Sequence, residues 1–140
     1  MKLNRRNFIS ASAGIAATIS SPMVFGASRP KVVVIGGGAG GATAARYIAK
    51  DSKGAIDVTL VEPTRSYYTC FFSNLYLGGF RDFDSIGHSY GKLASDYGIN
   101  VVHDWAVDVD SSVKTVSLAG GGTVNYCLLY TSPSQRDTTA

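Results

Sequence analysis

Lys31-Val32-Val33-Val34-Ile35-Gly36-Gly37-Gly38-Ala39-Gly40-Gly41 is the stretch that decides the fold of this chain. A β-branched run that enters Gly-x-Gly-x-x-Gly is typical of the first strand and phosphate turn of a dinucleotide-binding βαβ unit. We expect Gly36 to form the tight turn, Gly38 to let a pyrophosphate approach the backbone, and Gly41 to let helix and strand pack closely. The pyrophosphate is then expected over the amides at the start of the helix, where the helix dipole favours negative charge.

The residues after the turn favour this interpretation over that of a flexible glycine linker. Residues 42–50 are good helix formers, and the helix is expected to end near residues 51–54. Residues 56–62 form an alternating, β-branched run, which predicts the second strand. This run ends in Glu62, about 20 residues past the last glycine, where such a fold places the carboxylate that binds a ribose. Glu62 is therefore the expected ribose-binding residue, and a solvated strand end is the alternative.

Length and charge limit the classes of function that fit the chain. The 140 residues are enough for one modest domain, whereas a complete dinucleotide-dependent enzyme usually needs more. The net charge of +3 comes from the N-terminal segment, where Lys2, Arg5 and Arg6 precede the first acidic residue. Basic and acidic side chains balance over the rest of the domain, so nucleic-acid binding is not expected.

Residues 1–26 are predicted to be a twin-arginine export signal. Arg5-Arg6 is followed by the bulky pair Phe8-Ile9, a moderately apolar stretch over residues 11–19 and a small-residue exit at residues 24–27. The apolar stretch is too short and too rich in small residues to span a bilayer, so no transmembrane segment is expected. A surface helix or an uncleaved anchor is the alternative. The signal predicts a periplasmic protein that is exported already folded around its cofactor.

A segment dense in aromatic residues and containing one thiol follows the second strand. Pro63 ends the strand, and residues 64–74 read Thr-Arg-Ser-Tyr-Tyr-Thr-Cys-Phe-Phe-Ser-Asn. A segment at the carboxyl edge of the sheet lies close to a bound dinucleotide, so its aromatic side chains are expected either to stack on a flavin or to fill the core. From the residues alone, Cys70 is a redox thiol, a core cysteine or a covalent attachment point for a cofactor.

Several motifs together resemble one enzyme family from the export signal to about Tyr126. They are the twin arginines, the glycine turn, the run Val-Thr-Leu-Val-Glu-Pro, the sequence Tyr67-Tyr68-Thr69-Cys70 with Ser73-Asn74 behind it, and Val101-Val102-His103-Asp104. The glycine turn is shared by many flavoproteins, whereas the tyrosine and cysteine motif is specific. This combination is similar to the flavoprotein subunits of flavocytochrome c sulfide dehydrogenases.

The resemblance implies an α/β protein with the Rossmann-like FAD/NAD(P)-binding fold of the two-dinucleotide-domain flavoprotein reductases, here truncated, with residues 27–126 as the N-terminal part of the FAD-binding domain. In that family the matching cysteine is bonded through sulfur to the 8α-methyl group of FAD, so Cys70 is implied to carry FAD covalently, a role that suits a nucleophilic thiolate. Sulfide is the implied substrate. A c-type cytochrome subunit is the implied partner, since the chain has no Cys-x-x-Cys-His haem motif.

The catalytic residues stay unassigned, because the family's redox-active cysteine pair lies downstream and nothing in this chain matches it. The enzyme alternatives are a sulfide:quinone oxidoreductase, which should carry a membrane-binding C-terminal region, and an NAD(P)H-dependent FAD oxidoreductase, which should carry a second glycine motif. The alternative from another class is a non-catalytic FAD-binding fragment.

The middle of the chain is predicted to complete the domain without contributing a metal site. Residues 84–97 are expected to form a loop and a short helix, and residues 99–103 a strand. Residues 107–110, 113–118 and 123–126 then predict a small antiparallel meander, in which Gly120 to Gly122 form a hairpin turn and not a second phosphate loop. His88 and His103 are expected to be structural or solvent-facing, because they lack companions at metal-ligand spacing.

Residues 127–140 are predicted to be a non-native tail. Cys-Leu-Leu-Tyr-Thr-Ser, residues 127–132, is one translation of TGT CTC TTA TAC ACA TCT, the transposase adapter used to prepare sequencing libraries, and a natural polar C-terminus is the alternative. A disulfide between Cys70 and Cys127 would then have no biological meaning. We also expect the first strand to lack a neighbour on one side, which would leave an apolar edge open.

Overall fold

A four-stranded parallel sheet forms the centre of the computed structural model, which describes residues 28–132; residues 1–27, with the expected export signal, and residues 133–140 lie outside the described part. The strands lie in the order β5-β2-β1-β9. Their bounds are β1 Lys31–Ile35, β2 Asp57–Val61, β5 Asn100–Val102 and β9 Leu128–Thr131. This order confirms the predicted Rossmann-like α/β fold.

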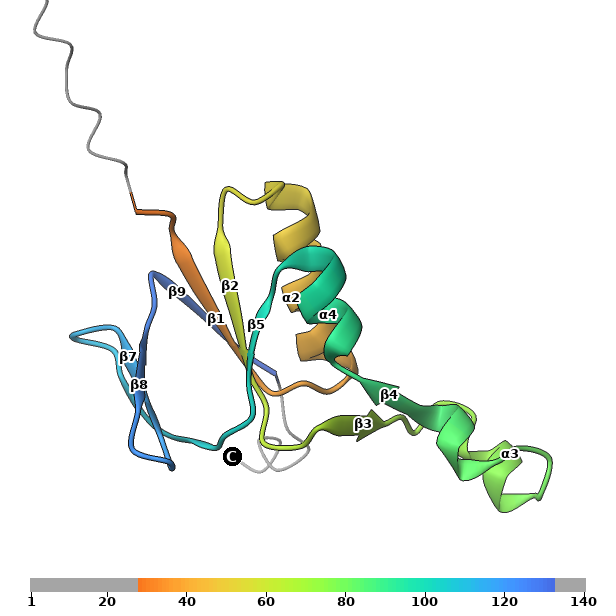
Figure 1. Ribbon diagram of the computed structural model, residues 1–140. Helices are drawn as coiled ribbons and strands as arrows, with labels where there is room; N and C mark the ends of the chain where they lie inside the picture. Colours follow the sequence, from red (N-terminus) through yellow and green to blue (C-terminus); the bar gives the residue numbers. More distant parts are fainter. Residues whose placement is uncertain (1–27, 133–140) are drawn as a thin grey trace, which may run out of the picture.

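Two helices cover one face of the sheet and a β-meander covers the other (Figure 1). The helices are α2, Ala39–Ser52, and α4, Gly91–Tyr97. The meander consists of β6 Ala106–Asp110, β7 Thr115–Leu118 and β8 Thr123–Asn125, paired antiparallel in that order. The second strand, the first helix and the meander therefore form where the sequence predicts them.

The side chains of the central strands β1 and β2 explain these two layers, because successive side chains of a strand point to opposite faces of the sheet. Val34 and Leu60 are fully buried on the helix side, where Ala45 of α2 packs against them. Val33 lies on the other side, where it packs with Val116 of the meander. Burial of each such aliphatic side chain contributes about 1.5–3 kcal/mol, so both layers hold the central strands in place.

An arm projects from the carboxyl end of the sheet (Figure 1). It contains β3 Ser66–Tyr68, α3 Ser73–Leu77, the 3-10 helix η1 Phe83–Ile86 and β4 Gly87–Ser89. β3 and β4 pair antiparallel, with Tyr67 opposite His88. The arm carries the aromatic-cysteine segment away from the layered domain, and it contains a short strand pair that the sequence does not predict.

The expectation of an open edge beside the first strand is wrong. β9 pairs with β1 in parallel, with Val33 opposite Leu129, and hydrogen bonds from Cys127 N to Lys31 O and from Ser132 N to Ile35 O extend the ladder at both ends. The physical reason is that Leu128 to Tyr130 form a short apolar run whose successive side chains face the two cores. Leu129 packs against one cluster and Tyr130 packs against the other, both partly buried. Whatever its origin, this segment forms the missing strand.

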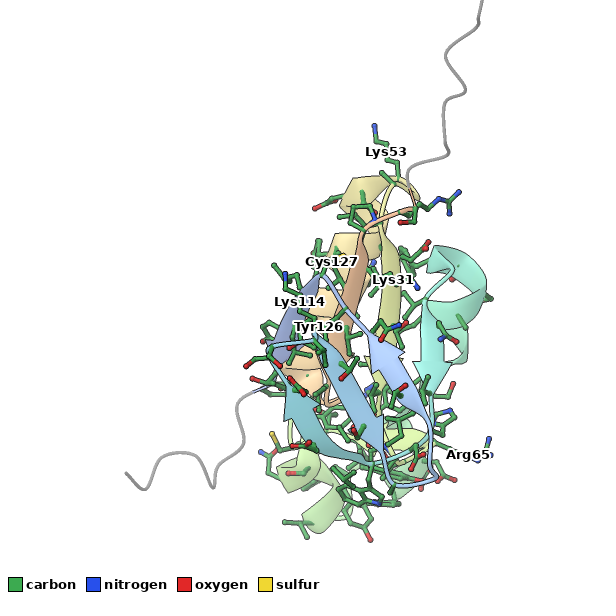
Figure 2. The ribbon with its side chains drawn as sticks, turned by 90° about the vertical axis from the view of Figure 1, so that its left-hand side faces the viewer. Lys31, Lys53, Arg65, Lys114, Tyr126 and Cys127 are labelled. Atoms are coloured by element: carbon green, nitrogen blue, oxygen red, sulfur yellow. The ribbon has the colours of Figure 1, made fainter. Side chains whose placement is uncertain are left out.

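The residues of the expected ligand site lie at one end of the layered domain. Figure 2 shows Lys53, just past α2, and Arg65, just past β2, at opposite ends of the molecule, and it shows Tyr126 and Cys127 where the chain passes from β8 to β9. The glycine turn, Glu62 and the arm all belong to the carboxyl end of the strands, where parallel α/β sheets bind ligands. No helix among residues 28–132 is long and apolar enough to cross a membrane.

Candidate nucleotide-binding site

The glycine turn joins β1 to α2 with almost no space between strand and helix. Gly36 has φ +94°, a conformation that side chains disfavour, and its N–H donates to Val61 O at 2.9 Å. A Cβ at Gly41 would collide with the Gly36 carbonyl oxygen, and it would also lie 3.4 Å from Val34 Cγ1. The roles predicted for Gly36, a tight turn, and for Gly41, close helix packing, therefore match the backbone.

The start of α2 offers four backbone N–H groups to a ligand. Ala42 is the first helix residue whose N–H has a backbone acceptor, Gly38 O at 2.9 Å. The preceding amides, those of residues 38–41, have no acceptor within the described part of the chain, and Gly38 as N-cap has no side-chain cap. A Cβ at Gly38 would meet nothing nearer than Tyr67 Cε2 at 3.9 Å. Unpaired amides at the positive end of a 14-residue helix, with open space beside Gly38, can bind an anion.

Glu62 follows β2 directly and its carboxylate lies against this turn. Oε2 accepts a hydrogen bond of 2.6 Å from Gly37 N–H, and Oε1 accepts bonds from Thr64 N–H at 3.0 Å and Thr64 Oγ1 at 2.6 Å. Partial burial alone would raise the pKa of the Glu62 carboxyl, but the hydrogen bonds from Thr64 and Gly37, with the nearby His103, outweigh it and lower that pKa. Glu62 is therefore a fixed carboxylate at neutral pH.

Two other residues support the strand end that carries Glu62. The backbone N–H of Glu62 donates to Val102 O at 2.9 Å, and His103 Nδ1 lies 3.1 Å from Glu62 O. Because a carbonyl only accepts, His103 donates this bond from Nδ1. The structural role expected for His103 is consistent with this contact.

Tyr90 reaches the glycine turn from the start of α4. Its side chain is buried, and its hydroxyl donates to Gly37 O at 2.9 Å. Burial and the charge of Glu62 raise the pKa of the Tyr90 hydroxyl, so it stays protonated and keeps donating. Beside this contact lies a cavity of about 480 Å³, lined by Gly37, Ala42, Thr43, Arg46, Tyr67, His88, Ser89, Tyr90 and Leu93.

Cys70 lies apart from the glycine turn, in the arm between β3 and α3. Its thiol is free and exposed, as is that of Cys127. Thr69 anchors this part of the arm, since its N–H donates to Ile86 O at 3.0 Å and its Oγ1 accepts from Phe71 N–H at 3.2 Å. Cys70 is thus no core cysteine, and it is accessible to a ligand that spans the carboxyl end of the sheet. Among the described residues, no three His, Cys, Asp or Glu side chains are placed to hold a metal ion.

Most aromatic residues of the arm are exposed, which argues against the interpretation that they fill the core. Phe71 and Phe72 are 61% and 62% exposed, and Tyr68 stacks on Phe83 with ring centroids 4.4 Å apart. Tyr67 is the exception, because it is partly buried against the helix-side core.

Two residues of the site are not predicted from the sequence. Thr64 holds the carboxylate of Glu62, and a hydroxyl two residues after an acidic residue was the signal available for it. Tyr90 reads as one apolar position in a helical pattern over residues 84–97, whereas it lies just before α4 and contacts a residue 53 positions earlier. No local pattern reveals that contact.

Comparison with known proteins agrees with this geometry. The family described as pyridine nucleotide-disulphide oxidoreductase matches residues 30–129. The chain is 54% identical over 44 residues, 31% of its length and 90% of the relative's sequence, to the flavoprotein chain of the flavocytochrome c sulfide dehydrogenase of Chlorobaculum thiosulfatiphilum. The family resemblance expected from the motifs is thereby confirmed over that span.

Two solved structures share the fold. The sulfide:quinone oxidoreductase of Aquifex aeolicus matches 73% of this chain and 24% of its own length, with 25% identity and a TM-score of 0.65. The NAD-dependent persulfide reductase of A. fulgidus matches 72% of this chain and 20% of its own, with 28% identity and a TM-score of 0.61. The chain therefore spans about a quarter or less of the length of these solved relatives.

Proposed function

Because the chain belongs to the pyridine nucleotide-disulphide oxidoreductase family, we propose that it is the FAD-binding part of an exported enzyme that oxidises sulfide and passes the electrons to a c-type cytochrome. The observation that carries the cofactor assignment is the anion site at the start of α2 with the Glu62 carboxylate beside it. The 54% identity to a sulfide dehydrogenase flavoprotein chain supports the choice of substrate and partner.

The residues at the turn fit the ADP half of FAD. The N–H groups of residues 38–41 would donate to the pyrophosphate, and the helix dipole would favour its negative charge. Glu62 would accept a hydrogen bond from a ribose hydroxyl, because its three existing hydrogen bonds fix its orientation and leave about one of its four lone-pair sites free. When bound, the flavin supplies a carrier that takes two electrons and releases them one at a time.

Cys70 is proposed as the covalent attachment point of the flavin, and the periplasm as the location of the enzyme. An exposed thiol on the arm, beyond the carboxyl end of the sheet, suits attachment of the part of FAD most distant from the pyrophosphate. A covalent bond would also retain the cofactor after export.

A sulfide:quinone oxidoreductase is the second candidate, favoured by the structural match to the Aquifex aeolicus enzyme. The two candidates share the flavin site proposed above and differ in the electron acceptor.

The proposal is tested on the protein expressed from the gene recovered at full length. Anaerobic sulfide should bleach the flavin absorbance, and oxidised cytochrome c added afterwards should be reduced as that absorbance returns. Reoxidation by a soluble quinone but not by cytochrome c would select the second candidate. A full-length protein that holds flavin but is not bleached by sulfide would contradict both.

The proposed role of Cys70 has its own test. After acid denaturation, flavin fluorescence should stay on the wild-type polypeptide and should move to the supernatant for Cys70→Ser. Ser66→Ala is the matched control, because Ser66 is also an exposed residue of the arm but carries no thiol, and this variant should retain the flavin. Flavin released wholly from the wild type would contradict covalent attachment.

A further inference from the structure

We propose that Tyr90 is a positioning residue of the nucleotide site, whose hydroxyl fixes the peptide between Gly37 and Gly38 so that the Gly38 N–H points toward the pyrophosphate. This inference rests on the proposed binding of a dinucleotide at the glycine turn, and it adds a residue from a distant part of the chain to that site.

The position of Tyr90 is tightly constrained. The side chain is 5% exposed, and its hydroxyl lies 2.9 Å from Gly37 O. A Cβ at Gly37 would lie 2.6 Å from the same hydroxyl oxygen and 2.7 Å from the ring, so the ring fills the space that any other residue at 37 would need. Tyr90 and the glycine at position 37 are therefore complementary in shape as well as joined by a hydrogen bond.

Planarity of the peptide carries the effect of this contact to the ligand side. The carbonyl of Gly37 and the N–H of Gly38 belong to one trans peptide and point in opposite directions. When the carbonyl is directed at Tyr90, the N–H is directed away from it. This N–H is one of the four that have no acceptor in the described residues.

The preceding peptide is held independently, because Gly37 N–H donates to Glu62 Oε2. The hydroxyl of Tyr90 thus fixes one side of Gly37 and the carboxylate of Glu62 fixes the other. Glycine lacks the steric limits of other residues, so without the hydroxyl the Gly37–Gly38 peptide would sample other orientations. Loss of the hydroxyl should therefore lower the affinity for ligands that contain a phosphate and leave the affinity for ligands without a phosphate unchanged.

The experiment compares ADP with adenosine on the flavin-free 140-residue chain. In Tyr90→Phe the dissociation constant for ADP should rise about fivefold, the size expected for one net hydrogen bond, while that for adenosine stays unchanged. Tyr97→Phe is the matched control, since the Tyr97 hydroxyl contacts Arg46 Nε at 2.9 Å and not the turn, and it should change neither constant. Replacing Tyr90 with 4-aminophenylalanine, which keeps a donor at the ring, should restore ADP binding.

Three results would overturn the inference alone, and a fourth would overturn it together with the proposed function. An unchanged affinity for ADP in Tyr90→Phe would mean that the hydroxyl does not act on the phosphate site, and an equal loss for ADP and adenosine would mean that Tyr90 only stabilises the fold. Failure of 4-aminophenylalanine to restore ADP binding in a chain with an unchanged melting temperature would exclude the donor role. A wild-type chain that folds but binds neither ligand would instead overturn the proposed function, and the inference with it.

Discussion

Glu62 and Gly37 are joined at the carboxyl end of the sheet, with Glu62 Oε2 2.6 Å from the Gly37 nitrogen. The parallel register of β1 and β2 produces this contact, since Ile35 lies opposite Val61 and the chain then leaves both strands at the same edge. The Glu62 carboxylate is thereby fixed beside the unpaired amides of residues 38–41. The amides attract a negatively charged group, whereas the carboxylate repels one and accepts hydrogen bonds from neutral hydroxyls. A dinucleotide satisfies both, because it presents phosphate to one and hydroxyls to the other.

Substitution at adjacent glycines of α2 should have opposite effects. Gly41→Ala forces a Cβ against the Gly36 carbonyl, and overpacking of this kind typically costs about 1–3 kcal/mol or more. Gly40→Ala puts its Cβ in ordinary contact, 3.5 Å from Ser132 Oγ, and should raise the free energy of unfolding by up to about 1 kcal/mol through helix propensity. Urea unfolding measures both, and a Gly41→Ala chain as stable as Gly40→Ala would contradict the close approach.

The lowered pKa of Glu62 predicts a stability that depends on pH. The folded chain favours the carboxylate, so this contribution is complete above the ordinary glutamate pKa of about 4.3 and is lost as pH falls through the lowered value. Glu62→Gln should therefore lose less stability than the wild type between neutral and acid pH. Urea midpoints measured from pH 7 downwards test this, and parallel curves for the two chains would contradict it.

Substitution of Thr64 should change the pKa and the orientation of the Glu62 carboxylate and leave the backbone of the glycine turn unaltered. Thr64→Val removes the hydroxyl that donates to Glu62 Oε1 at 2.6 Å and keeps the side-chain shape. The pKa of Glu62 should rise, because a hydrogen bond that favours the carboxylate is lost. ADP should bind several-fold more weakly, because the carboxylate is no longer held in one orientation. NMR titration of the Glu62 carboxyl carbon measures the pKa. Thr123→Val, on an exposed strand position of the meander, is the control and should leave it unchanged.

The edge strand β9 should be needed for the solubility of the chain. Leu129 packs into the core cluster with Val33, whereas its neighbour Leu128 is 56% exposed. Leu129→Asp should destabilise the chain by about 2–5 kcal/mol and release β9 from the edge of β1, which would promote aggregation. Leu128→Asp should be nearly neutral. Light scattering and thermal melts distinguish the two, and equal behaviour of the variants would contradict the burial of Leu129.

Local sequence patterns are sufficient to predict most of the elements of the fold. β1, the glycine turn, α2 and β2 follow from propensity and spacing, because each is specified by residues close together in the chain. β9 is not predictable in this way, because a short run such as Leu-Leu-Tyr becomes a strand only when a partner edge is available. In the site, Glu62 is predictable from its distance to the glycines, whereas Tyr90 depends on a tertiary contact across 53 residues.

We propose that the start of α2 and Glu62 together bind the ADP part of a dinucleotide. This proposal is tested most directly by titrating the isotope-labelled chain with ADP and following its backbone amides by NMR. We expect saturable binding, with the largest shifts at the amides of residues 38–41 and a further shift at Glu62. Saturable binding that leaves these five amides unmoved, or no binding by a folded chain, would contradict it.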